Sequence, residues 1–77
     1  IGGTVDFFIL NNEGRIDKIV EVKKTNKKHW YPTPRDKKQY EVLSKIQKKF
    51  KVPVEYWIKI NGKWNFLDIS EVKRFLS

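Results

Sequence analysis

The dipeptide Asn61-Gly62 is the feature that most constrains how this chain can fold. It separates two runs in which polar and apolar residues alternate, VEYWIKI over 54–60 and KWNFL over 63–67. Asn-Gly between alternating runs is a strong signal for a two-residue β-hairpin, because both residues tolerate the positive φ of the tight turn. We therefore expect two antiparallel strands joined at this position.

A second hairpin is predicted near the N-terminus. The runs TVDFFIL over 4–10 and IDKIVEV over 16–22 are rich in β-branched and aromatic residues, and the turn cluster NNEG over 11–14 lies between them. Apolar residues occupy both faces of these strands, which is typical of strands covered on each side. We expect the strands to be central in the sheet.

Helix signals fill the rest of the chain. Thr33 is placed as an N-cap, with Pro34 at the first helical position and Asp36 completing a capping box, so a helix is predicted from there to about Phe50. The stretch 23–32 lacks periodicity and is interpreted as a loop, while Asp68 is expected to cap a short last helix. The predicted fold is one mixed α/β domain over 1–77 in the order β-β-α-β-β-α.

The charge balance limits the function classes. Seventeen Lys and Arg residues against nine Asp and Glu residues give a net charge of +8, which suits nucleic acid as a partner and equally suits a lysine-rich solvated surface. Without cysteine and with His29 as the single histidine, the chain can form neither a disulfide nor a zinc cage by itself. No apolar run reaches the ~20 residues that span a membrane, and no signal peptide is visible, so we expect a cytoplasmic protein.

Three charged residues interrupt the first two apolar runs. Glu21 and Lys23 share a face of their strand because side chains alternate. A symmetric turn on Asn12-Glu13 predicts that Asp6 lies opposite Ile19, diagonal to Glu21, so that two carboxylates could share one hard cation. Such a cation activates water for phosphodiester hydrolysis, and a nearby lysine stabilises the developing charge. The alternative is that these residues are ordinary solvent-facing groups on an exposed sheet.

The order of these parts resembles the PD-(D/E)xK nuclease superfamily, and within it the archaeal Holliday-junction resolvases. This chain matches three features of the superfamily: an Asp on one strand, a (D/E)xK triplet on the next strand, and a following helix that carries Gln39. The matching segments are the Gly-rich approach to the Asp over 2–6, the E-x-K strand over 20–23, the basic stretch into the Gln helix over 31–39 and the C-terminal W-x-F…R segment over 64–74.

The resemblance implies a restriction-endonuclease-like mixed β-sheet flanked by helices, and a Mg²⁺-dependent endodeoxyribonuclease that acts on branched DNA such as a four-way junction. It implies that Asp6, Glu21 and the carbonyl of Val22 hold Mg²⁺, with Mn²⁺ as a substitute, that Lys23 acts at the phosphate and that Gln39 orients the site. Two symmetrical cuts imply a homodimer that takes part in DNA recombination and repair. The resolvases carry a further helix before the Asp strand, which adds an acidic residue to the metal site. Residues 1–3 leave no room for it, so we expect that it has been lost by truncation, that it lies on a segment outside this sequence, or that this protein works without it.

The predicted nucleic-acid contacts lie mainly in the loop before the helix. Aromatic side chains there can stack on bases while basic ones meet phosphates. The residues are Lys24, Lys27, Lys28, Trp30, Tyr31, Arg35 and Lys38. The alternative for Trp30 is a ring that folds back over the sheet, and the alternative for Gln39 is a satisfied core amide.

Two further hypotheses stay open for the whole chain: another nuclease of the same superfamily, whether restriction-like, repair or exonuclease, and a catalytically inactive nucleic-acid-binding module.

Overall fold

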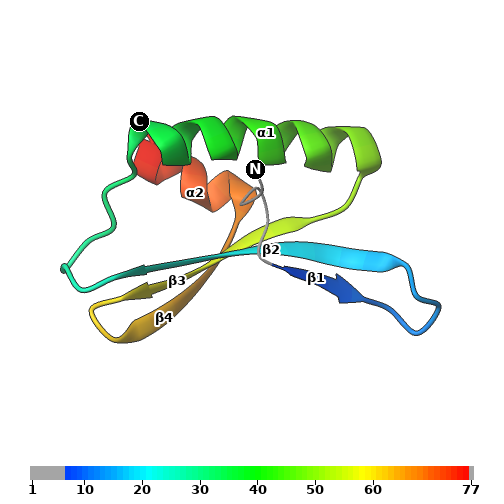
Figure 1. The fold of residues 1–77 in the computed structure, drawn as a ribbon, viewed down its shortest axis with the longest axis horizontal. Coiled ribbons are helices and arrows are strands. Elements are labelled where there is room, and N and C mark those ends of the chain that lie inside the picture. Colours follow the sequence, from blue (N-terminus) through cyan, green and yellow to red (C-terminus); the bar gives the residue numbers. More distant parts are fainter. Residues whose placement is uncertain (1–6, 77) are drawn as a thin grey trace.

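A four-stranded mixed sheet carries two helices on one of its faces (Figure 1). The computed structural model describes residues 7–76. The elements follow the predicted order along the chain: β1 (Phe7–Leu10), β2 (Ile16–Thr25), α1 (Pro34–Phe50), β3 (Val54–Ile60), β4 (Lys63–Asp68) and α2 (Ile69–Leu76). The sheet order is β1-β2-β3-β4, so every strand lies beside its sequence neighbour. The prediction of a small mixed α/β domain is confirmed.

The hairpin of β3 and β4 forms as predicted. Trp57 pairs with Phe66, and Ile60 pairs with Lys63 next to the turn. Asn61 and Gly62 have φ values of 49° and 83°, the left-handed conformation that the tight turn requires and that this residue pair adopts most readily.

The hairpin of β1 and β2 has a different register from the predicted one. Phe8, rather than Asp6, lies opposite Ile19, and Asp6 lies outside the described residues. The turn is anchored on Asn11, whose side-chain oxygen accepts hydrogen bonds from the backbone N–H groups of Glu13 and Arg15. The pairing also shifts between Ile9 and Leu10. The prediction of a symmetric turn on Asn12-Glu13 is therefore wrong. The hydrogen bonds to the Asn11 side chain and the shift in pairing between Ile9 and Leu10 give the hairpin a different register.

The helix ends confirm the capping predictions. Thr33 Oγ1 accepts a hydrogen bond of 3.1 Å from the Asp36 N–H, and the Asp36 carboxylate accepts one of 2.9 Å from the Thr33 N–H. α1 ends at Phe50 and is capped by the left-handed residue Lys51, whose N–H donates to the carbonyl of Gln47. α2 starts with a reciprocal pair in which the Glu71 N–H donates to the Asp68 carboxylate and the Asp68 N–H donates to the Glu71 carboxylate.

The hydrophobic core lies between the helices and the helix-facing side of the sheet. β2 and β3 run parallel, so the chain must cross over between them, and α1 makes that crossing. The buried cluster consists of Ile19, Trp30, Leu43, Val54, Tyr56, Ile58, Ile69 and Val72. Both helices cover the same face, and the second face carries no described helix, so the prediction of helices on both sides of the sheet is wrong for the described residues. The first two strands were both expected to be central, but only β2 is, because β1 is an edge strand. Among residues 7–76 no helix is long and apolar enough to cross a membrane.

Candidate functional site

Lys23 is the centre of a polar cluster between β2 and α1. Strand β2 continues to Thr25, beyond the predicted end at 22, and so fixes Lys23 on the helix-facing side of the sheet. Its ammonium donates a 2.7 Å hydrogen bond to Gln39 Oε1 and a 3.0 Å hydrogen bond to Asp36 Oδ1, and it lies 3.4 Å from Glu21 Oε2. Three of the predicted site residues, Glu21, Lys23 and Gln39, are therefore brought together, and the amide of Gln39 serves this cluster.

Glu21 lies at the buried end of the cluster. The residue is 3% exposed, an environment in which a carboxylate is costly without a compensating charge. It pairs in register with Tyr56 of β3, and within residues 7–76 no group hydrogen-bonds to the buried Tyr56 hydroxyl. Burial, the negative charges of Glu21 and Asp36, and the neighbouring Tyr40 raise the pKa of Tyr56, so the phenol stays protonated. The inner part of the site thus combines a carboxylate, an ammonium and a neutral hydroxyl.

Asp36 is a site residue that the sequence pattern assigned only to helix capping. Burial raises the pKa of Asp36, but hydrogen bonds from the Thr33 backbone and from Lys23 outweigh it and hold the pKa below its ordinary value. The carboxylate therefore stays ionised beside the ammonium. The signal that could have found it is its spacing from Gln39, because residues three apart lie on the same side of a helix.

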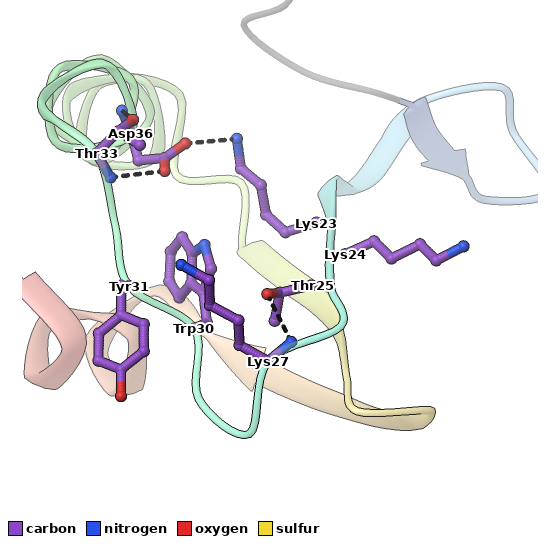
Figure 2. Close-up of a pocket in the computed structure, with 8 residues that line it drawn as sticks. All are labelled: Lys23, Lys24, Thr25, Lys27, Trp30, Tyr31, Thr33 and Asp36. Atoms are coloured by element: carbon purple, nitrogen blue, oxygen red, sulfur yellow. Dashed lines mark hydrogen bonds and ion pairs between the residues drawn. The ribbon is translucent and has the colours of Figure 1, made fainter.

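A pocket of about 310 Å³ opens beside this cluster (Figure 2). Its lining comes from the end of β2, the following loop and the start of α1, and consists of Lys23, Lys24, Thr25, Lys27, Trp30, Tyr31, Thr33 and Asp36. Figure 2 shows Lys23 extending toward Asp36, whereas Lys24, the next residue of the strand, extends the opposite way. The Lys27 ammonium lies 5.9 Å from the centre of the Tyr31 ring, and Tyr31 is 64% exposed. An exposed ring beside lysines is suited to a base and its phosphates.

The prediction that Trp30 stacks on bases is wrong. The residue is 7% exposed, and its ring lies 5.5 Å from that of Phe75 and 6.1 Å from that of Tyr56. The alternative prediction, a ring folded back over the sheet, is the one that the structure shows. Its large apolar surface gains more from burial than a solvated loop position allows.

The remaining predicted nucleic-acid contacts do not gather at this pocket. Arg35 and Lys38 are exposed on α1 and line a separate hollow together with Pro34, Lys37 and Glu41. Lys28 is exposed in the loop and lines neither of these two pockets. These three cations therefore extend the basic surface around the start of α1.

The described residues fit a metal site only in part. Within the range 7–76 no three His, Cys, Asp or Glu side chains cluster closely enough to hold an ion. The Glu21 carboxylate and the Val22 carbonyl, adjacent in β2, are oxygen donors of the kind that Mg²⁺ takes. Tyr56 pairs with Glu21 from β3, and within residues 7–76 its buried hydroxyl has no hydrogen-bond partner. A second carboxylate is still required, and the predicted one, Asp6, lies outside the described residues.

Comparisons of the chain with models of known protein families, with curated proteins and with solved structures find no match.

Proposed function

We propose that this chain is a metal-dependent DNA endonuclease of the PD-(D/E)xK type, with a restriction-endonuclease-like fold and a preference for branched DNA such as a four-way junction. The observation that carries the proposal is the contact between strand and helix: Lys23 reaches Gln39 at 2.7 Å and the buried Glu21 at 3.4 Å. These are the strand and helix parts of the motif, and their contact is what the resemblance leads us to expect.

Each residue of the cluster has a role in this proposal. Glu21, with Asp6 and the Val22 carbonyl, would hold Mg²⁺, which when bound polarises a phosphoryl oxygen and lowers the pKa of a coordinated water. Lys23 would donate to the scissile phosphate, where charge develops. Gln39 and Asp36 restrict the position of its ammonium, because both accept hydrogen bonds from it.

The pocket beside the cluster would hold the strand that is cut. Lys27 would meet a phosphate, and the exposed Tyr31 ring would stack on a base. Two symmetrical cuts in a junction require two active sites, so the enzyme is proposed to act as a homodimer.

The direct test is cleavage of a synthetic four-way junction in Mg²⁺ or Mn²⁺, compared with linear and flapped duplexes of the same sequence. We expect cleavage to be strongest on the junction, to be abolished by EDTA and to be lost in Glu21→Gln. Glu13→Gln is the matched control, because Glu13 is an exposed carboxylate in the β1–β2 turn. Gln39→Ala, at a half-buried position, is the second variant and should slow cleavage without abolishing binding. Cleavage that survives Glu21→Gln would sink the site assignment.

A catalytically inactive nucleic-acid-binding module is the second candidate. It is favoured by the ion pairs that Lys23 makes with Glu21 and Asp36, since an ammonium between two carboxylates stabilises the fold without any metal. This function predicts salt-sensitive DNA binding with no divalent-ion-dependent turnover on any of the three substrates.

A further inference from the structure

The sheet face opposite the helices carries a cluster of aromatic residues. Side chains alternate along a strand, so the residues that pair across β3 and β4 at Trp57↔Phe66 and Lys59↔Trp64 project from the same face. These four residues, Trp57, Lys59, Trp64 and Phe66, are called the aromatic patch. Lys24 of β2 extends away from the Lys23 cluster (Figure 2). It pairs in register with Lys59 and therefore borders the patch.

The rings of the aromatic patch contact one another; Phe66 and Trp64 are open to solvent, and Trp57 is half-buried. The Phe66 ring lies 5.4 Å from the Trp57 ring at 86°, and 6.4 Å from the Trp64 ring at 15°, which is close to parallel. Phe66 is 63% exposed and Trp64 is 48% exposed. Single exposed apolar residues need no explanation, but contiguous exposed aromatics indicate a binding surface.

The charges around the rings identify the chemistry of the partner. The Lys59 ammonium lies 5.9 Å from the centre of the Trp64 ring. Within residues 7–76 no carboxylate lies within ion-pair distance of Lys24 or Lys59. The carboxylates on this face are already engaged: Glu55 binds Lys18 at 2.7 Å and the Trp57 indole N–H at 2.9 Å, and Asp68 caps α2.

This combination is selective for one class of partner. Flat rings with adjacent, uncompensated lysines match the bases and phosphates of a single strand, because every base offers a π-face and every nucleotide a negative charge. A duplex keeps its bases stacked inside, where the rings cannot reach them. A second copy of this chain packed on the same patch would add its own Lys24 and Lys59 to the interface, while Glu55 and Asp68 on this face are already engaged.

We propose that the aromatic patch binds single-stranded DNA by base stacking on Trp64 and Phe66 and by phosphate contacts from Lys24 and Lys59. This surface lies on the other side of the sheet from the Glu21–Lys23–Gln39 cluster, so it is a second nucleic-acid site and not part of the proposed active site. The choice of DNA over RNA rests on the proposed function. The patch would hold an unpaired strand that flanks a branch point.

The test is fluorescence anisotropy of a labelled oligothymidylate of about 12 nucleotides, a length within the range that single-strand-binding folds cover, measured in EDTA so that no cleavage occurs. We expect Phe66→Ala to weaken binding about tenfold, and Trp64→Ala to do the same. The matched control is Phe50→Ala: Phe50 is 62% exposed, nearly the same as Phe66, but it lies at the end of α1. Lys59→Gln should reduce the slope of log affinity against log salt by about 0.7, the value for one phosphate contact on a single strand.

Other outcomes would overturn the proposal. Phe66→Leu keeps an apolar side chain without a ring, so unchanged affinity in this variant would exclude stacking. Equal weakening by Phe50→Ala would show that the effect does not belong to the patch. If Phe66→Ala converts a dimer into a monomer by light scattering while the affinity stays the same, the patch is an interface between copies. Tighter binding of oligouridylate would exclude the assignment to DNA.

The two proposals can fail separately. The aromatic patch and the Glu21–Lys23–Gln39 cluster lie on opposite faces of the sheet, so the loss of one site leaves the other in place. Patch-dependent binding without any metal-dependent cleavage would therefore refute the nuclease proposal alone, and cleavage without patch-dependent binding would refute the single-strand site alone.

Discussion

Replacing Asp36 by Asn tests whether one carboxylate holds both the start of α1 and the position of Lys23. The side chain is nearly isosteric, and its amide oxygen can still accept from the Thr33 N–H, so the change removes mainly a charge. The carboxylate accepts hydrogen bonds from Thr33 and Lys23 at 2.9 and 3.0 Å and lies in the first turn of the helix. The cost should therefore reflect the lost charge at both contacts.

The magnitude follows from these contacts. Changing charged hydrogen bonds to neutral ones costs about 1 kcal/mol, and losing a negative charge at a helix N-terminus costs a further ~0.5 kcal/mol. The side chains of Lys23 and Asp36 are 19% and 17% exposed, so solvent screens their ion pair less than it would screen a surface pair. A loss of about 1.5 kcal/mol in the free energy of unfolding corresponds to a decrease in Tm of roughly 6–12 °C for a domain of this size.

The assay is thermal unfolding followed by circular dichroism between pH 7 and pH 2. The pKa of Asp36 is lowered in the folded state, so its contribution is complete above the unfolded value of 3.8 and is lost as the pH falls through the folded value. The difference in Tm between wild type and Asp36→Asn should therefore be constant near neutral pH and close on acidification. Asp17→Asn is the control for net charge, because Asp17 is exposed near the start of β2. Equal Tm values for the two variants at pH 7 would refute the reasoning.

Two further predictions concern side chains whose burial decides the outcome. Trp30→Ala should lower the free energy of unfolding by about 3–5 kcal/mol, because it empties a core position. Tyr31→Ala, at the next and exposed residue, should lower it by less than about 0.5 kcal/mol. Chemical denaturation measures both losses, and equal losses would contradict the packing of Trp30 against Tyr56. Lys23→Met removes the ammonium that lies between the carboxylates of Glu21 and Asp36, and it should destabilise the fold by about 3 kcal/mol at pH 7. Urea melts measure the loss against Lys24→Met at the neighbouring exposed lysine, and equal losses for the two variants would mean that the ion pairs of Lys23 contribute nothing.

Features that depend on neighbours in the sequence were predictable here. The Asn61-Gly62 turn and the Thr33–Asp36 capping box are determined within four residues, and both form as the sequence indicates. The register of the first hairpin was not predictable from the same rules, because it depends on the Asn11 side chain and on an irregularity in the pairing next to it. The hydrogen bonds to the Asn11 side chain leave the order of apolar and polar residues along the strands unchanged, so the hydrophobic pattern does not reveal them.

Two of the site residues were predictable because they share a strand, and Gln39 on α1 was expected from the family resemblance. Glu21 and Lys23 share a face by alternation, but the reach of Lys23 to Asp36 depends on where α1 packs. The inward position of Trp30 likewise depends on α2, since its ring packs against Phe75. Sequence patterns assign a loop residue to solvent by default, and only the assembled core decides whether a large ring is buried instead.

The parallel contact between β2 and β3 has a consequence for how the protein folds. Each antiparallel hairpin can close locally, on a timescale of about 1–10 μs, whereas β2 and β3 can pair only after α1 and its flanking loops have brought distant segments together. That contact is therefore the step expected to limit the folding rate. It also joins the strand of Glu21 and Lys23 to that of Tyr56, so the site is assembled only when the two halves of the sheet associate.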